Sequence, residues 1–193
     1  LGASSGAAFG AALAILLGFG NAGITISAFF FSLLTVALVY LIGQRAQGKR
    51  ILNLVLAGMV VSSLFTAGTS YIKLVADPTN QLPAITYWLM GSLSGVRMTK
   101  VLYIFPVMLL GLVPLFLLRW KINLLTLGDE EAQAMGIHPV RLRFVIVICA
   151  TLVTSASISV AGTIGWVGLV VPHLSRKLTG SNFKKLLPAS MLA

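Results

Sequence analysis

The chain has 193 residues, of which 58% are hydrophobic and 9% are charged, and its mean hydropathy is +0.98. Soluble domains carry about 25% charged residues, so this composition excludes a globular cytosolic enzyme, and its apolar content excludes a disordered chain. The 14 Lys and Arg residues against 4 Asp and Glu give a net charge of +10. Because these basic residues separate long uncharged runs, they indicate a membrane protein and not a nucleic-acid-binding domain.

Uncharged apolar runs predict the membrane spans. Residues 1–44 contain no Asp, Glu, Lys or Arg. Since about 20 helical residues cross a membrane, this run predicts two helices joined by a tight turn at residues 18–23, where several glycines accept positive φ. The runs 51–72 and 101–118 each predict one further span.

A stripe of small residues marks the first predicted helix. Its members recur every four residues, so they lie on one face: Gly2, Gly6, Gly10, Ala14 and Gly18. In a membrane such a face lets another backbone approach closely. We interpret it as packing within the bundle, with a dimer seam as the alternative.

The segment 73–100 between the third and fourth spans is expected on the outer side. It contains Tyr87 and Trp88, and these residue types favour the membrane interface, so we predict a short helix at the outer rim. Arg97 and Lys100 either attract an acidic binding protein or extend to the interface as ordinary flanking charges.

The last long run, 144–175, has 32 residues, too many for one span. Gly162 and Gly165 are expected to divide it into two helices, and Pro172 is expected to bend the second. Neighbouring helices would then have to cover the freed backbone groups.

The distribution of basic residues supports this division. With Arg45, Lys49 and Arg50 on the cytoplasmic side, a double crossing of 144–175 leaves 11 basic residues inside and 3 outside, whereas a single crossing gives 7 on each side. We therefore predict six complete transmembrane helices and the start of a seventh near Leu186.

These elements predict an all-α, polytopic membrane helical bundle. Residue 1 is Leu, and the final residues enter a fresh apolar stretch. We expect an internal fragment of a longer protein in which residues 1–193 form one transmembrane domain.

The acidic residues bear on the source of energy for transport. All four lie in predicted loops: Asp77, Asp129, Glu130 and Glu131. Carriers driven by protons or sodium normally place carboxylates within the membrane. If this protein moves a solute, the energy is therefore expected to come from outside the chain.

No catalytic group, metal ligand set or cofactor site is expected. Residues 43–50 match the phosphate-loop spacing except at the last position, Arg50, and they follow a membrane span instead of a strand. His138 and His173 lie far apart and lack acidic neighbours in the apolar runs, and Cys149 is the single cysteine.

The predicted cytoplasmic loop 119–143 contains a short helix over residues 129–135. Gly128 precedes three carboxylates on the first turn, where the helix dipole favours them. Gly136 is positioned as a C-terminal cap, and Pro139 ends the run. This helix is either a solvated connection or a rigid peg that docks on a soluble partner.

Several stretches carry a resemblance to a known family. Leu127-Gly128, Ala132 and Met135-Gly136 are similar to its coupling-helix pattern, and residues 162–176 are similar to its most recognisable run. Shorter matching islands lie at 1–7, 87–93 and 186–188. On these residues the sequence resembles the FecCD-type permeases of ABC importers over essentially its whole length.

The resemblance implies a ten-helix permease subunit, of which this chain supplies about the third to the eighth helix and the start of the ninth. It implies a location in the cytoplasmic membrane of a bacterium or archaeon, and a cargo of the iron-siderophore, haem or cobalamin class. The implied partners are a second permease subunit (identical or a paralogue), a cytoplasmic ABC ATPase dimer that hydrolyses the ATP, and a periplasmic or lipid-anchored binding protein. The alternative is a secondary transporter or channel without an ATPase partner.

The resemblance also implies roles for individual residues. The ATPase contact would comprise Leu127, Gly128, Ala132, Met135 and Gly136, to which we add the intervening acids Asp129, Glu130 and Glu131 because they share the helix. The cytoplasmic gate would lie around Arg50, Ile51 and Leu52. The residues of the long family motif, expected to be structural, are Gly162, Gly165, Gly168, Pro172, His173 and Arg176.

Overall fold

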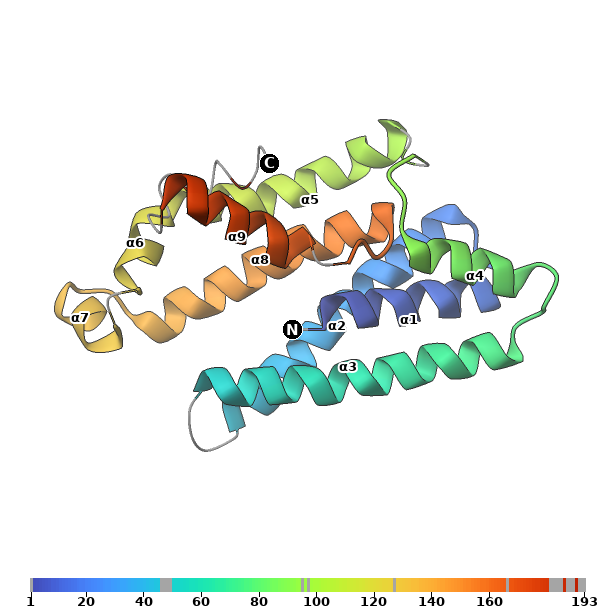
Figure 1. Ribbon diagram of the computed structural model, residues 1–193, viewed down its shortest axis with the longest axis horizontal. Coiled ribbons are helices and arrows are strands. Elements are labelled where there is room, and N and C mark those ends of the chain that lie inside the picture. Colours follow the sequence, from blue (N-terminus) through green and yellow to red (C-terminus); the bar gives the residue numbers. More distant parts are fainter. Residues whose placement is uncertain are drawn as a thin grey trace. The chain divides into compact units, whose positions relative to one another are not determined.

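The computed structural model describes residues 2–45, 50–94, 96, 98–126, 128–165, 167–180, 186 and 190, and the regular secondary structure within them is α-helical (Figure 1). The helices are α1 (Ala3–Leu16), α2 (Asn21–Arg45), α3 (Arg50–Val75), α4 (Gln81–Met90), α5 (Met98–Leu117), α6 (Arg119–Leu124), α7 (Asp129–Ala134), α8 (Pro139–Ala161) and α9 (Val167–Thr179). The predicted all-α fold is confirmed. The predicted spans fall on α1, α2, α3, α5, α8 and α9, and the six membrane crossings stay a prediction.

Several of these helices have the dimensions of membrane spans. Within the described ranges, Asn21–Gln44, Leu52–Val75 and Pro139–Ala161 are long and apolar enough to cross a membrane, judged by length and composition. Ala3–Leu16 and Val101–Leu117 are shorter apolar helices. The chain therefore has the features of a multi-pass membrane protein.

A turn between the first two helices is confirmed, but it is shorter than the predicted 18–23, because α2 already begins at Asn21. After α1, Gly18 has a φ of 73°. Its N–H donates to the Ile15 carbonyl at 3.0 Å, and the Phe19 N–H donates to the Ala14 carbonyl at 2.9 Å. These two bonds satisfy carbonyls that the end of α1 would otherwise leave unpaired.

The chain divides into two compact units. The first comprises Leu1–Val107 and Thr151–Ile164, and the second comprises Met108–Ala150 and Gly165–Ala193. The first unit contains α1 to α4 and the end of α8. The second contains α6, α7, α9 and the start of α8.

The glycine face of α1 packs inside the first unit. A β-carbon at Gly6 would collide with the Thr35 hydroxyl and lie 2.5 Å from the Phe31 carbonyl oxygen, and one at Gly10 would lie 2.5 Å from the Ser27 carbonyl oxygen. The Ser27 hydroxyl also donates to the Gly10 carbonyl at 2.7 Å. Intramolecular packing of α1 against α2 is thus confirmed at Gly6 and Gly10.

A buried polar contact also joins α2 to the end of α8. The hydroxyls of Ser32 and Ser155 lie 2.8 Å apart, and both residues are fully buried. In an apolar bundle such a pair satisfies both hydroxyls and links two helices that are distant in sequence.

Candidate functional site

Helix α7 is held at its C-terminus by a complete capping motif. Gly136 has a φ of 77°. Its N–H donates to the Gln133 carbonyl at 2.9 Å, and the Ile137 N–H donates to the Ala132 carbonyl at 3.0 Å. This pair of bonds is a Schellman motif. The predicted cap is confirmed, and α7 ends at Ala134, one residue before the predicted end.

The N-terminus of α7 depends on Gly128. This residue has a φ of 133°, and its carbonyl accepts the first helical hydrogen bond, from the Ala132 N–H at 3.2 Å. A β-carbon at Gly128 would collide with the Glu131 carboxylate, which folds back over the helix start. A side chain at this position would therefore disturb both the backbone and the packing of Glu131.

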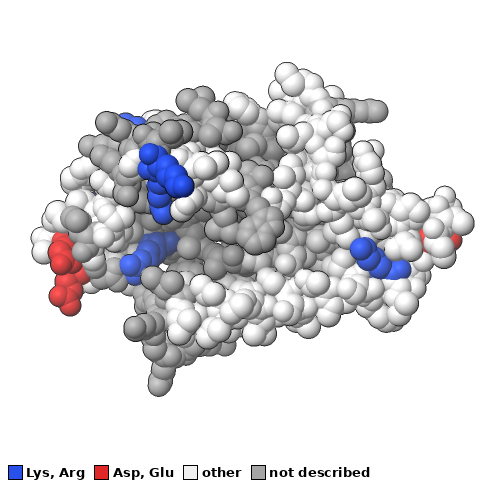
Figure 2. Space-filling model, in the orientation of Figure 1, with Lys and Arg blue, Asp and Glu red and all other residues white. Residues whose placement is uncertain are grey.

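One face of α7 is anchored and the other is exposed. Ala132 is fully buried. Glu130 and Glu131 are exposed, and the Met135 side chain is 48% exposed. The carboxylates stand out at the surface beside α7 in Figure 2. The helix thus presents Glu130, Glu131 and the apolar side chain of Met135 at its surface, and it buries Ala132.

The remaining predicted coupling residues are only partly described. Leu127 lies outside the described residues, and Asp129 is the first residue of α7. Structure and sequence agree on the short helix, on its C-terminal cap and on the exposure of Glu130 and Glu131.

The predicted gate residues lie at the start of α3. Arg50 is its first residue and Ile51 the second, and the Leu52 side chain is 55% exposed. Beyond them α3 carries a row of apolar side chains that are about half exposed or more: Val55, Leu56, Met59, Val60 and Leu64. This apolar face is uncovered by the described residues.

The residues of the long family motif lie in two segments, the connection between α8 and α9 and helix α9 itself. Gly162 and Gly165 lie between α8 and α9, which confirms the predicted break in the last long run. The others lie on α9: Gly168, Pro172, His173 and Arg176. His173 and Arg176 are exposed.

Gly162 allows a close contact between α8 and the end of α4. Its φ is 74°, and a β-carbon there would lie 2.5 Å from the Trp88 carbonyl oxygen and 2.9 Å from the Gly91 Cα. Two hydrogen bonds flank the contact: the Ser92 N–H donates to the Ala161 carbonyl at 2.8 Å, and the Thr163 hydroxyl donates to the Leu89 carbonyl at 2.5 Å.

The start of α4 is fixed to α1. The Gln81 side chain accepts a hydrogen bond from the Asp77 N–H at 3.1 Å and donates to the Leu16 carbonyl at 3.1 Å. The Thr79 hydroxyl and the Asn80 N–H both donate to the Asp77 carboxylate, at 2.7 and 2.9 Å. The bond from Thr79, followed by those from Asn80, lowers the pKa of the Asp77 carboxyl.

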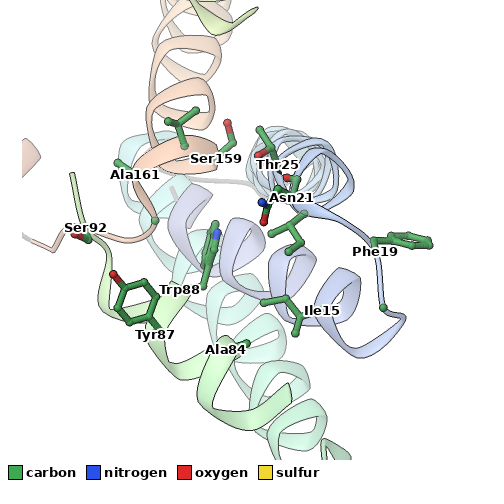
Figure 3. A pocket seen from close by; sticks show the side chains of 14 residues that line it. Ile15, Phe19, Asn21, Thr25, Ala84, Tyr87, Trp88, Ser92, Ser159 and Ala161 are labelled. Carbon is green, nitrogen blue, oxygen red and sulfur yellow. Dashed lines mark hydrogen bonds between the residues drawn. The ribbon is translucent and has the colours of Figure 1, made fainter. Parts of the chain in front are cut away.

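A cavity of about 390 Å³ lies among the ends of α1, α2, α4 and α8 (Figure 3). Its walls include Ile15 of α1, Asn21 and Thr25 of α2, Tyr87 and Trp88 of α4, and Ser159 of α8. Sequence reasoning predicted the short helix and its two aromatic residues. It missed the cavity because the walls come from segments up to about 140 positions apart.

Among the described residues, no group of three His, Cys, Asp or Glu side chains lies close enough together to hold a metal ion. The described residues offer three features to consider for function: the exposed face of α7, the apolar face of α3 and the cavity beside α4.

An all-helical bundle with several apolar helices of membrane length defines a multi-pass membrane protein. Comparison with known sequences identifies its family. The chain belongs to the FecCD transport family, which matches residues 1–193.

Its relatives are permease proteins. The chain is 40% identical over 192 residues to the molybdate import system permease protein MolB of Haemophilus influenzae, covering all of this chain and 57% of the relative. It is 44% identical to a probable iron chelatin transport system permease protein of Helicobacter pylori, covering 58% of it. It is 36% identical to the cobalamin import system permease protein BtuC of Halobacterium salinarum, covering 52%. The chain thus spans just over half the length of these relatives.

A solved structure agrees with the sequence comparisons. The chain superimposes with a TM-score of 0.92 and 40% identity on a metal-chelate type ABC transporter described in an inward-facing conformation, covering 99% of this chain and 61% of that one. The similarity therefore extends to the helix arrangement as well as to the sequence.

Proposed function

We propose that the chain is part of the permease subunit of an ATP-driven ABC importer that carries a metal chelate across the cytoplasmic membrane of a bacterium or archaeon. Membership of the FecCD transport family supports this function. Relatives are named for the import of molybdate, cobalamin and Fe(3+)-citrate. The cargo belongs to this class of chelated metals and metal oxyanions.

The observation that carries the proposal is the construction of α7. A six-residue helix has little stability of its own, yet α7 has a complete C-terminal cap and a buried Ala132, while Glu130 and Glu131 are exposed. Caps of this kind are common among helices. The proposed docking role requires such a fixed segment, because movement of a docked ATPase reaches the membrane helices only through a segment that does not deform.

In this proposal the loop 119–143 faces the cytosol and the exposed face of α7 docks on a separate ABC ATPase, which hydrolyses the ATP. The contact uses Glu130, Glu131 and Met135 directly. Gly128, Ala132 and Gly136 shape the helix. The chain itself is not an enzyme.

The exposed face of α3 supports a second permease subunit as partner. A row of half-exposed apolar side chains on a helix that also begins at the proposed gate suits an interface around a translocation path. We place the gate around Arg50, Ile51 and Leu52. Alternating access then follows from rigid movements that open the path to one side at a time, and a binding protein on the outer side delivers the cargo.

Replacement of Ala132 by Leu tests the docking role in the complete protein. Ala132 has no exposed surface, so a larger side chain displaces α7, and uptake of labelled ferric siderophore should be lost while membrane insertion remains. Ala37→Leu, at an exposed position of α2, is the matched control and should transport normally. Normal uptake by Ala132→Leu would contradict the docking role.

Charge removal separates docking from folding. The double variant Glu130→Gln, Glu131→Gln keeps the size of two exposed side chains and introduces no positive charge at the helix start. Helix α7 should therefore stay folded while the ATPase subunit no longer co-purifies in mild detergent. The cysteine of a Glu130→Cys variant should react with an impermeant thiol reagent only after the cells are opened. Labelling from outside intact cells would place the loop on the wrong side of the membrane.

The cargo is identified by uptake assays with the complete protein in a strain that depends on it. Labelled ferric siderophore, haem, cobalamin and molybdate are supplied in turn, and the substrate whose uptake requires both this protein and ATP is the cargo.

A further inference from the structure

The lining of the cavity beside α4 includes none of the residues assigned above to the ATPase contact or to the cytoplasmic gate. It lies wholly within the first unit and is bordered by the ends of three apolar helices and by α4. At about 390 Å³, its volume lies at the lower end of the range of about 300–1,000 Å³ that is typical of small-molecule pockets.

Three polar side chains at this cavity are free to bind a ligand. The indole N–H of Trp88, the hydroxyl of Tyr87 and the side-chain amide of Asn21 have no hydrogen-bond partner within the described part of the chain. In Figure 3 the nitrogen of the Trp88 indole and the Asn21 amide turn toward the middle of the ring of lining residues, whereas the Phe19 ring points away. Among the described residues no buried side-chain nitrogen or oxygen lacks a hydrogen-bond partner, so these three groups are open to solvent and accessible to a ligand.

The three other hydroxyl side chains of the lining already have partners. The Thr25 hydroxyl donates to the Asn21 carbonyl at 3.0 Å, the Ser159 hydroxyl donates to the Ala156 carbonyl at 2.9 Å, and the Ser92 and Ser94 hydroxyls lie 2.7 Å apart. The Trp88 indole N–H can only donate, so the cavity calls for a ligand that offers an acceptor oxygen.

The rest of the wall selects for a neutral, partly apolar ligand. None of the lining residues is charged, and Ile15, Ile24 and Val160 supply apolar surface. An anionic group would meet no cation here. Neutral carbonyl oxygens joined to a hydrocarbon chain match both the donors and the apolar wall.

The cavity also lies at the depth where such groups occur in a membrane. Helices α1 and α8 end at it and α2 begins at it. At the same end of the unit, α3 acquires its first charge after the uncharged run, at Lys73. Trp and Tyr concentrate at this interfacial level, where the fatty-acid ester groups of phospholipids join the glycerol backbone.

We propose that this cavity binds the ester-linked end of one phospholipid acyl chain. Trp88 and Asn21 donate hydrogen bonds to an ester carbonyl oxygen, Tyr87 contributes its hydroxyl at the rim, and the first part of the chain lies against Ile15 and Ile24. The volume holds one ester-linked segment, so the headgroup stays outside. Bound in this way, the lipid fills the space between α4 and the ends of α1, α2 and α8.

Native mass spectrometry of the delipidated, full-length protein in detergent tests the site. Dipalmitoyl phosphatidylethanolamine is titrated against its diether analogue, which has the same headgroup and chain length but lacks the carbonyl oxygens. The ester lipid should bind more tightly. Since a neutral hydrogen bond contributes about 0.5–1.5 kcal/mol net, Trp88→Phe and Asn21→Ala should each weaken the ester lipid about two- to tenfold and leave the ether lipid almost unchanged.

Control variants keep the result interpretable. Trp120→Phe alters an exposed tryptophan of α6, outside the cavity, and should bind the ester lipid as the unaltered protein does. Tyr87→Phe removes a single hydroxyl from an exposed side chain, so it tests the site even if Trp88→Phe unfolds. Equal binding of ester and ether lipids, or unchanged ester binding in Trp88→Phe and Tyr87→Phe, would overturn the proposal. Binding of a transported chelate in this cavity, with no lipid bound there, would also overturn the proposal.

Discussion

The contact between α1 and α2 and the segment around α7 both depend on small residues, but for different physical reasons. Gly6 and Gly10 are required for space, because carbonyl groups of α2 lie where their β-carbons would be. Gly136 is required for its conformation: its φ is 77°, and nothing lies within 4 Å of a β-carbon built there. The first requirement comes from residues distant in sequence, and the second is entirely local.

This difference matches what each region does. Between membrane helices, close approach is the main source of affinity, because lipid removes the hydrophobic drive for one apolar surface to cover another. At α7 the chain must hold a short helix in place with almost no buried surface. Local hydrogen bonds of the cap do this without support from distant elements.

The largest effect is expected where space is the constraint. Gly6→Ala places a methyl group against the Thr35 hydroxyl and the Phe31 carbonyl, and neither helix backbone can yield without opening the packed face. We expect a loss of about 3 kcal/mol in the free energy of unfolding, measured by denaturant titration of the full-length protein in mixed micelles. Gly20→Ala is the control, since nothing lies within 4 Å of its β-carbon; an equal loss in both variants would refute the role of close packing.

A pair of glycines with nearly the same φ separates the two constraints. Gly162 (φ 74°) packs against Trp88 and Gly91, whereas Gly136 (φ 77°) faces open space. Alanine at Gly136 should cost about 1 kcal/mol, the strain of the left-handed conformation alone. Alanine at Gly162 should cost about 2–3 kcal/mol, since it adds a clash. Equal losses of stability in the same titration would show that α4 is not held tightly against α8.

The sequence predicted the locally determined features best. Uncharged runs indicated the apolar helices α1, α2, α3, α5 and α8, because a membrane span needs about 20 apolar residues whatever its neighbours are. The end of α7 was predicted to within one residue because Gly136 and Ile137 are themselves the cap. Helix α6, only six residues long, was not predicted, since so short a segment has no clear periodicity.

For contacts between distant segments, the sequence indicated that a packing face exists but not which residues it contacts. The spacing of Gly6 and Gly10 indicated a packing face without naming its partner, and intramolecular packing and a dimer seam both remained possible. No local pattern marks Ser32 and Ser155, whose hydroxyls meet across 123 positions. The cavity depends likewise on where four helix ends meet, which a single sequence does not specify.

A smaller effect is expected at this buried serine pair. Ser32→Ala and Ser155→Ala each leave one fully buried hydroxyl without its partner, so each single variant should lose about 1 kcal/mol of stability. The double variant should lose less than the sum of the two. A double-mutant cycle should give a coupling of about 0.6 kcal/mol, the average for hydrogen bonds between membrane helices. Strict additivity would mean that the two hydroxyls do not interact.

The smallest effect is expected at the turn before α4, which is a local structure like the α7 cap but fully exposed. Hydrogen bonds from Thr79 and Asn80 lower the pKa of Asp77 below its ordinary value of 3.8. Ionised Asp77 therefore stabilises the folded state above that value, and this contribution disappears as the pH falls through the lowered pKa. The full-length protein should melt slightly above the Asp77→Asn variant at pH 6, and the difference should vanish at strongly acidic pH. Because Asp77 is solvent-exposed, salt should also reduce the difference. A gap in melting temperature that is unchanged down to the acidic limit would show that the carboxylate charge plays no part in stabilising the turn before α4.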